Sequence, residues 1–167
     1  NEIVEQAGVS VGAFYGRVKD KDGLLEALDE RFFTCFEADI LDLISAPGWA
    51  QMPVIKIIKG LCSLLVNTYS RQTGLLRSLN LKARLYDDQR FRKREQKAWN
   101  ELFPRLQQAL LLKCDEFKHP DPQVAIVFGF QQMFFTLREI LLWEPLRSQR
   151  LYDNEELINE LTRAYLV

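Results

Sequence analysis

Apolar residues recur every three or four positions along most of the chain, the spacing that places them on one face of an α-helix. The clearest run predicts a helix from Lys21 to about Ile44, directly after Asp20, which is a favourable N-cap. The Ala-Pro-Gly sequence at residues 46–48 predicts its end. Because β-branched residues nowhere form alternating runs, the pattern favours an all-α fold.

The same spacing predicts further helices along the rest of the chain. We expect them at residues 54–69, 75–86, 89–117, 121–143 and 154–166. Pro104 is expected to kink the third of these, because proline lacks the backbone donor and crowds the preceding turn. The fourth has a strong start, since Asp121 is a favourable N-cap and Pro122 suits the first helical position.

The chain opens with two shorter helical segments joined by Gly-Val-Ser. Gly8 is expected to end the first segment by adopting a positive φ, and Ser10 to cap the second, which runs to about Arg17. Two short helices joined in this way are a candidate helix-turn-helix. The predicted division is therefore a DNA-binding helix-turn-helix domain at residues 1–23 and a larger helical domain at residues 24–167.

Residues 7–25 read AGVSVGAFYGRVKDKDGLL, which resembles the helix-turn-helix signature of TetR-family transcriptional regulators. That pattern has Ala-Gly-Val-Ser, then a tyrosine after a few variable positions, and later a lysine before an apolar pair. The resemblance implies a sequence-specific, homodimeric DNA-binding regulator, a repressor that a small-molecule effector releases. The family module has three helices and the first is missing here, so we expect further N-terminal residues in the natural protein.

The resemblance also implies how the second short helix and the start of the next would contact double-stranded operator DNA. Small apolar side chains would read base edges in the major groove, while hydroxyls and cationic groups would contact the backbone. The expected DNA-binding residues are Val11, Gly12 and Ala13 at base edges, Ser10 and Tyr15 at phosphates, Arg17 at a phosphate or a guanine edge, and Lys21 on the backbone.

The larger domain carries many aromatic residues, and the resemblance implies that it encloses an effector and forms the homodimer. For each of these residues taken singly, a place in the hydrophobic core is favoured over a place in a pocket, although a pocket is expected somewhere among these helices. The residues expected to line an effector pocket are Leu61, Leu65, Tyr69, Tyr86, Trp99, Phe103, Phe128, Gln131 and Phe135. The 121–143 helix is apolar nearly all round, which favours burial against a second subunit. The residues expected at this dimer interface are Val124, Ala125, Gly129, Gln132, Thr136 and Ile140.

Composition limits the other function classes. A net charge of −1 does not by itself favour nucleic-acid binding, so the DNA-binding hypothesis depends on the signature. The three cysteines form no CxxC pair, and we expect a cytoplasmic protein with no metal and no cofactor. No uninterrupted apolar stretch approaches the roughly 20 residues that cross a bilayer, so no membrane partner is expected.

Two other sequence features and one other function class bear on this interpretation. The Glu116-x-x-His119 pair is one half of a helical di-iron motif, but the chain has a single histidine, which also argues against the usual catalytic triads and an enzyme. The basic run at residues 90–97 is expected to be a solvated helix face. The main alternative to the regulator is a helical small-molecule-binding or scaffolding protein that no longer binds DNA.

Overall fold

The computed structural model describes residues 20–85, 89–143 and 152–166, together with six residues of the N-terminal segment (Gly8, Ser10, Gly12, Ala13, Gly16 and Val18). The described part contains helices and turns but no strand, which confirms the predicted all-α fold class. The elements are α3 (Lys21–Ser45), η1 (Trp49–Gln51), α4 (Val54–Arg71), α5 (Thr73–Leu85), α6 (Gln89–Leu111), η2 (Cys114–Glu116), α7 (Pro122–Leu137), η3 (Arg138–Leu142) and α8 (Asn154–Leu166).

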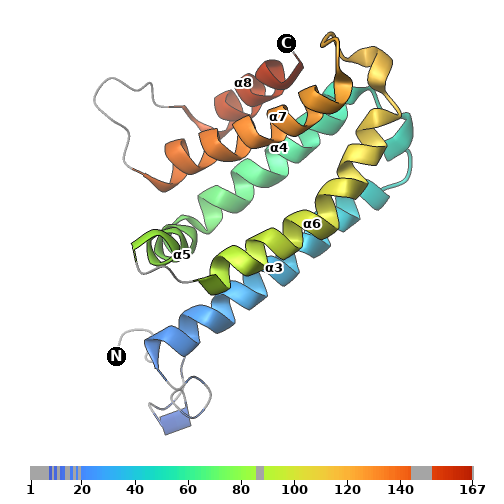
Figure 1. Cartoon of the computed structure of the whole chain (residues 1–167). Helices are drawn as coiled ribbons and strands as arrows, with labels where there is room; N and C mark the ends of the chain where they lie inside the picture. Colours follow the sequence, from blue (N-terminus) through green and yellow to red (C-terminus); the bar gives the residue numbers. More distant parts are fainter. Residues whose placement is uncertain are drawn as a thin grey trace.

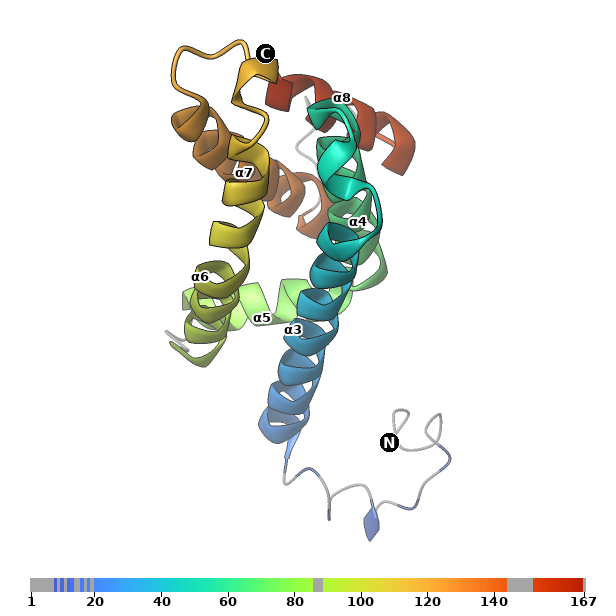
Figure 2. The same ribbon diagram turned by 90° about the vertical axis from the view of Figure 1, so that its right-hand side faces the viewer.

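Four long helices, α3, α4, α6 and α7, are arranged around a common axis (Figures 1 and 2). α3 packs on α6 and α4, and α7 packs on α6 and α4. α5 crosses one end of this arrangement, and α8 packs on α4 and α7 from the outside. α3 extends beyond the other helices at its N-terminal end, toward the start of the chain. This projecting end carries Lys21.

The core is centred on α4, whose buried face is continuous along the helix. Its fully buried residues include Ile58, Leu61 and Val66, and they meet Phe130 and Leu137 of α7. Each fully buried side chain of this size contributes about 1.5–3 kcal/mol relative to an exposed one. The packing of α4 therefore fixes the positions of the other helices around it.

Two predicted helix starts are confirmed by their caps. Asp20 has extended backbone, and its Oδ1 accepts a hydrogen bond of 2.8 Å from the amide of Gly23, in the first turn of α3. Asp121 accepts a hydrogen bond of 3.1 Å from the amide of Val124, in the first turn of α7. Both caps satisfy amides that have no partner inside the helix.

The prediction of one helix over residues 89–117 is wrong at its C-terminal end. α6 stops at Leu111, and a turn leads into η2. Phe117 is buried there, and Oε2 of Glu116 accepts a hydrogen bond of 2.9 Å from the amide of Val54, the first residue of α4. Glu116 therefore satisfies a free amide at the start of α4. No glycine or proline marks the end of α6, so the sequence pattern did not reveal it.

The predicted 121–143 helix changes its winding near its end. After α7, Arg138–Leu142 form a π-helical turn, a geometry that is rare and often found at functional sites. Together they form a 21-residue run, the one helix among the described residues that is long and apolar enough to cross a membrane by length and composition. The run is interrupted by Gln131, Gln132 and two charged residues, of which Arg138 forms an ion pair with Glu95 of α6.

Candidate effector pocket and DNA-reading segment

Two local features predicted for the N-terminal segment are present in its described residues. Gly8 adopts a φ of 64°, in the left-handed region that favours glycine. The hydroxyl of Ser10 accepts a hydrogen bond of 3.1 Å from the amide of Ala13, which is the predicted N-cap. Gly12 and Ala13 are helical and exposed. The predicted contacts by Val11, Tyr15 and Arg17 lie outside the described residues.

Lys21 is the first residue of α3 and is exposed. The free amides of a helix N-terminus carry a partial positive charge, and the Lys21 ammonium adds a full charge beside them. This combination suits a phosphate group. The carboxylate of Asp22 lies next to it in the chain, but it forms an ion pair of 2.6 Å with Lys82 of α5.

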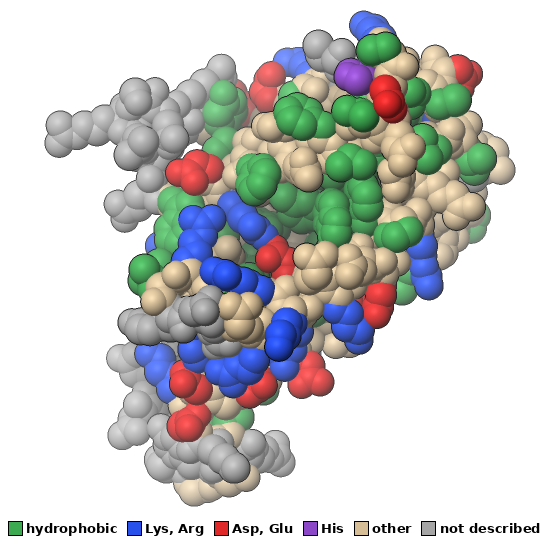
Figure 3. All heavy atoms as spheres, in the orientation of Figure 1, with side chains coloured by type: hydrophobic (Ala, Val, Ile, Leu, Met, Phe, Trp, Pro, Cys, Tyr) green, Lys and Arg blue, Asp and Glu red, His purple; other side chains and the backbone are tan. Residues whose placement is uncertain are grey.

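A cavity of about 490 Å³ lies among α3, α4, α6 and α7, with α5 and η3 at one end. This volume is within the range of small-molecule sites. Hydrophobic side chains gather on the surface between α6 and α7, and Lys and Arg side chains gather where α5 and α6 meet (Figure 3). The lining residues come from six elements, so the cavity is a property of the whole helical domain.

Aromatic rings form most of the cavity body. Trp99 and Phe103 of α6 stack with their centroids 4.4 Å apart. Phe130 and Phe134 of α7 meet the Trp99 ring edge-on, at 6.2 and 5.5 Å. Phe32 and Phe36 of α3 stack at 5.9 Å on another wall. Offset or edge-on contacts of this kind are the preferred arrangements of aromatic pairs, and they give the cavity largely aromatic walls.

The end of the cavity near α5 is polar. Arg138 of η3 forms an ion pair with Glu95 of α6, and both line the cavity together with Tyr69, Asn80 and Arg92. Burial raises the pKa of the Tyr69 phenol above its ordinary value, and the Arg138 guanidinium, which also hydrogen-bonds it, opposes that rise. The Nε atom of Arg138 is buried and has no hydrogen-bond partner among the described residues.

Seven of the nine predicted pocket residues line this one cavity. They are Leu61, Leu65, Tyr69, Trp99, Phe103, Gln131 and Phe135. Tyr86 lies outside the described residues. Phe128 does not line this cavity, and its side chain is 57% exposed. Phe130 and Phe134 take that role instead.

The sequence pattern reveals neither the polar end of the cavity nor the wall contributed by α3. The apolar spacing that predicts this helix includes Phe32, Phe36 and Ile40 but not Phe33, and it does not indicate that they line a cavity. A pattern that marks a buried face does not distinguish packing against a helix from packing around a cavity. Arg138 and Glu95 are separated by more than 40 positions, and no sequence signal pairs them.

The predicted dimer residues divide between two environments. Val124 and Gln132 are exposed, and Val124 forms an apolar stripe on α7 with Phe128 and Phe135. Ala125 and Ile140 pack instead against the core of the same chain, and Thr136 is partly buried. The close helix approach expected at Gly129 also occurs within the chain. A Cβ at Gly129 would lie 2.6 Å from the ring of Tyr165 in α8.

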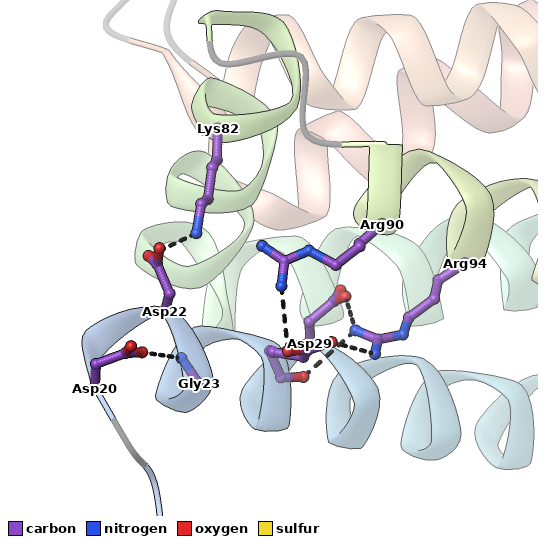
Figure 4. Close-up of polar contacts among 8 residues, drawn as sticks. Asp20, Asp22, Gly23, Asp29, Lys82, Arg90 and Arg94 are labelled. Carbon is purple, nitrogen blue, oxygen red and sulfur yellow. Dashed lines mark hydrogen bonds and ion pairs between the residues drawn. The ribbon is translucent and has the colours of Figure 1, made fainter.

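A network of ion pairs joins the N-terminal half of α3 to α6 (Figure 4). Arg94 forms an ion pair with Asp29, whose side chain is only 3% exposed, and lies 3.5 Å from the carboxylate of Glu26. Arg90 forms a second ion pair with Glu26 at 3.2 Å. The predicted solvated face therefore holds at Arg90, which is exposed, but is wrong at Arg94, which is partly buried and pairs with a buried carboxylate. Their positions tie α6, a wall of the cavity, to the helix that begins at Lys21.

Among the described residues, no group of three or more histidine, cysteine or carboxylate side chains is placed to hold a metal ion. No known family, curated protein or solved structure matches this chain. The site is therefore interpreted from its own geometry.

Proposed function

We propose that this protein is a DNA-binding transcriptional regulator of the TetR type, a repressor that a small-molecule effector releases from its operator. The observation that carries the proposal is the placement of α3. This single 25-residue helix begins within the C-terminal part of the helix-turn-helix signature and continues into the wall of the cavity. Lys21 stands at one end of it, and Phe32, Phe36 and Ile40 line the cavity farther along.

The proposed mechanism is a population shift. An effector that binds one arrangement of the cavity more tightly than another shifts the population toward that arrangement. Because α3 is continuous, a change at Phe32 or Phe36 moves the end that carries Lys21. In a homodimer this changes the spacing of two reading helices, which must lie about one DNA turn apart on a near-palindromic operator. An effector that left operator affinity unchanged would contradict this mechanism.

The salt dependence of DNA binding tests the proposed DNA contact. Lys21→Ala in the full-length protein removes a phosphate contact, so it should weaken binding to every duplex and reduce the slope of log K against log salt by about 1 per contact. The matched control is Lys118→Ala, which removes the same charge from an exposed position in the loop before α7. Fluorescence anisotropy over a salt series measures both variants.

The two variants should behave differently. Lys118→Ala should keep the parental slope, and Lys21→Ala should not. Equal slopes for Lys21→Ala and the parent would contradict the proposed contact at Lys21. If the parent bound no duplex at all while the cavity still bound ligands, the alternative of a small-molecule-binding protein without DNA binding would replace the proposal.

A further inference from the structure

We propose that the cavity takes a neutral aromatic alcohol of the phenol type, with its ring among the aromatic walls and its hydroxyl donating to Oδ1 of Asn80. This inference rests on the proposed function in treating the ligand as the effector, and it depends on different atoms from those that contact DNA. It follows from one acceptor and one donor that have no partner, and from the pairing of the charges at the polar end of the cavity.

The acceptor is the side-chain oxygen of Asn80. This residue is 6% exposed and lines the cavity. Its Nδ2 donates a hydrogen bond of 2.9 Å to the carbonyl of Leu76, which identifies Oδ1 as the other end of the amide. Oδ1 receives no hydrogen bond from the described residues, and it is not one of the unpartnered atoms that are sealed from solvent. A ligand that fills the cavity without donating there leaves this acceptor unpaired, which costs free energy.

The donor is the phenol hydroxyl of Tyr69, which is also 6% exposed and lines the cavity. The Arg138 guanidinium hydrogen-bonds this hydroxyl, and because a guanidinium only donates, the phenol oxygen accepts. The hydroxyl hydrogen has no acceptor among the described residues. Burial raises the pKa of the phenol, so it remains a donor at neutral pH. A ligand hydroxyl both donates and accepts, so it matches Asn80 and Tyr69 together, whereas a plain N–H group matches only Asn80.

The charged groups that line the cavity favour a neutral ligand, because they already have partners. Arg138 forms an ion pair with Glu95. Arg92 is exposed and donates a hydrogen bond of 2.8 Å to the carbonyl of Ala83. A charged ligand would leave water without gaining an unpaired opposite charge, and burial of such a charge is costly.

The body of the cavity favours an aromatic ring. Trp99 and Phe103 stack on each other, and Phe130 and Phe134 meet the Trp99 ring edge-on. A further ring among them gains offset or edge-on contacts in addition to the burial of its apolar surface. The volume of about 490 Å³ accommodates a ligand of two fused rings.

The inference is tested with two probes of nearly the same shape, 2-naphthol and 2-methylnaphthalene, of which only the first has a hydroxyl. Equilibrium dialysis measures their binding to the full-length protein, without DNA and at neutral pH. Because the methyl compound is the more apolar one, the effect of each substitution is compared between the probes. Asn80→Leu keeps the branched side-chain shape and removes the acceptor, so it should weaken 2-naphthol binding by about tenfold without weakening 2-methylnaphthalene.

Two further variants complete the comparison. Tyr69→Phe removes the donor and keeps the ring, so it should weaken 2-naphthol by about threefold to tenfold and spare 2-methylnaphthalene. Asn67→Leu is the control, because it makes the first substitution at an exposed position of α4 outside the cavity. It should leave the binding of both probes unchanged. Retained binding of 2-methylnaphthalene shows in each variant that the cavity is intact.

Charged probes test the preference for a neutral ligand. The parent protein should bind 2-naphthoate and 2-naphthylmethylammonium about tenfold more weakly than 2-naphthol. Equal or tighter binding of either ion would overturn this part of the inference. No binding of 2-naphthol at millimolar concentration, or equal effects of Asn80→Leu on 2-naphthol and 2-methylnaphthalene, would overturn the assignment to Asn80. If Tyr69→Phe left 2-naphthol binding unchanged, the choice of a hydroxyl over an N–H group would be wrong.

The outcomes separate this inference from the proposed function, because none of these measurements involves DNA. If 2-naphthol binds as expected but the protein binds no duplex, the ligand class stands and the regulator proposal fails. If the protein binds its operator but Asn80→Leu does not distinguish the two probes, the ligand class is wrong and the regulator proposal stands.

Discussion

Removal of Arg94 should be the most destabilising single change at the junction of α3 and α6. Its guanidinium neutralises Asp29, whose side chain is 3% exposed, and Arg94 itself is 29% exposed. Arg94→Met keeps much of the side-chain volume but leaves a buried carboxylate without this guanidinium. Breaking a buried ion pair from one side costs about 3–5 kcal/mol. Because Arg94 is partly exposed, we expect a loss of about 3 kcal/mol.

Arg90→Met is the matched control, because the same substitution one turn away breaks an exposed pair. Arg90 and Glu26 are 52% and 43% exposed, so this pair should contribute no more than about 1 kcal/mol. For a chain of this size each kcal/mol changes the melting temperature by about 2–4 °C. Arg94→Met should therefore melt roughly 6–12 °C below the parent, and Arg90→Met within about 4 °C of it.

Urea unfolding followed by circular dichroism measures both free energies. Adding Asp29→Asn to Arg94→Met should recover part of the loss, because the buried charge is then removed together with its partner. If Arg94→Met and Arg90→Met cost the same, the distinction between a buried and an exposed ion pair at this junction is wrong. If Asp29→Asn makes the Arg94→Met protein still less stable, the buried carboxylate is not the source of the loss.

Three further predictions concern packing, burial and capping. Gly129→Ala should cost about 1–3 kcal/mol of unfolding free energy in urea, because its Cβ would overlap the ring of Tyr165, whereas Gly74→Ala, with open space around it, should be neutral or stabilising. Equal effects would contradict the close approach. Burial raises the pKa of the Cys62 thiol from 9.0 to about 11. Between these two pH values the thiol is therefore protonated in the folded state and deprotonated in the unfolded chain. Stability should therefore fall as pH rises from about 9 to 11, and Cys62→Ala should lessen that fall; an unchanged slope would show that other groups cause it. Asp121→Ala should cost about 1 kcal/mol, measured by thermal melting, through loss of the α7 cap, and no change would mean that the cap contributes nothing.

The sequence predicted the helical elements well where the pattern and the end signals agreed. α3 and α8 were predicted nearly to the residue, because Asp20 caps one and a regular apolar face marks the other. The end of α6 was missed because it depends on Phe117 and Glu116 docking against α4, a tertiary effect. The π-helical turn was missed for the same reason, since its residues continue an ordinary helical pattern.

The candidate site was predictable only in its apolar part. Residues such as Leu61 and Trp99 were identified from composition and helix faces, and these faces do surround the cavity. Its polar end depends on Arg138 and Glu95, which come together only when η3 packs near α6. A strongly apolar helix gives little periodicity from which to choose its buried face, so the sequence did not separate Phe128, which is exposed, from Phe130, which lines the cavity.

The most direct test of the regulator proposal is selection of bound duplexes from a random DNA library by the full-length protein. We expect an enriched near-palindrome whose half-sites lie about 10 base pairs apart, and loss of that enrichment in Lys21→Ala. Bound DNA that resembles the starting library, or an enriched sequence that Lys21→Ala binds as well as the parent does, would contradict it.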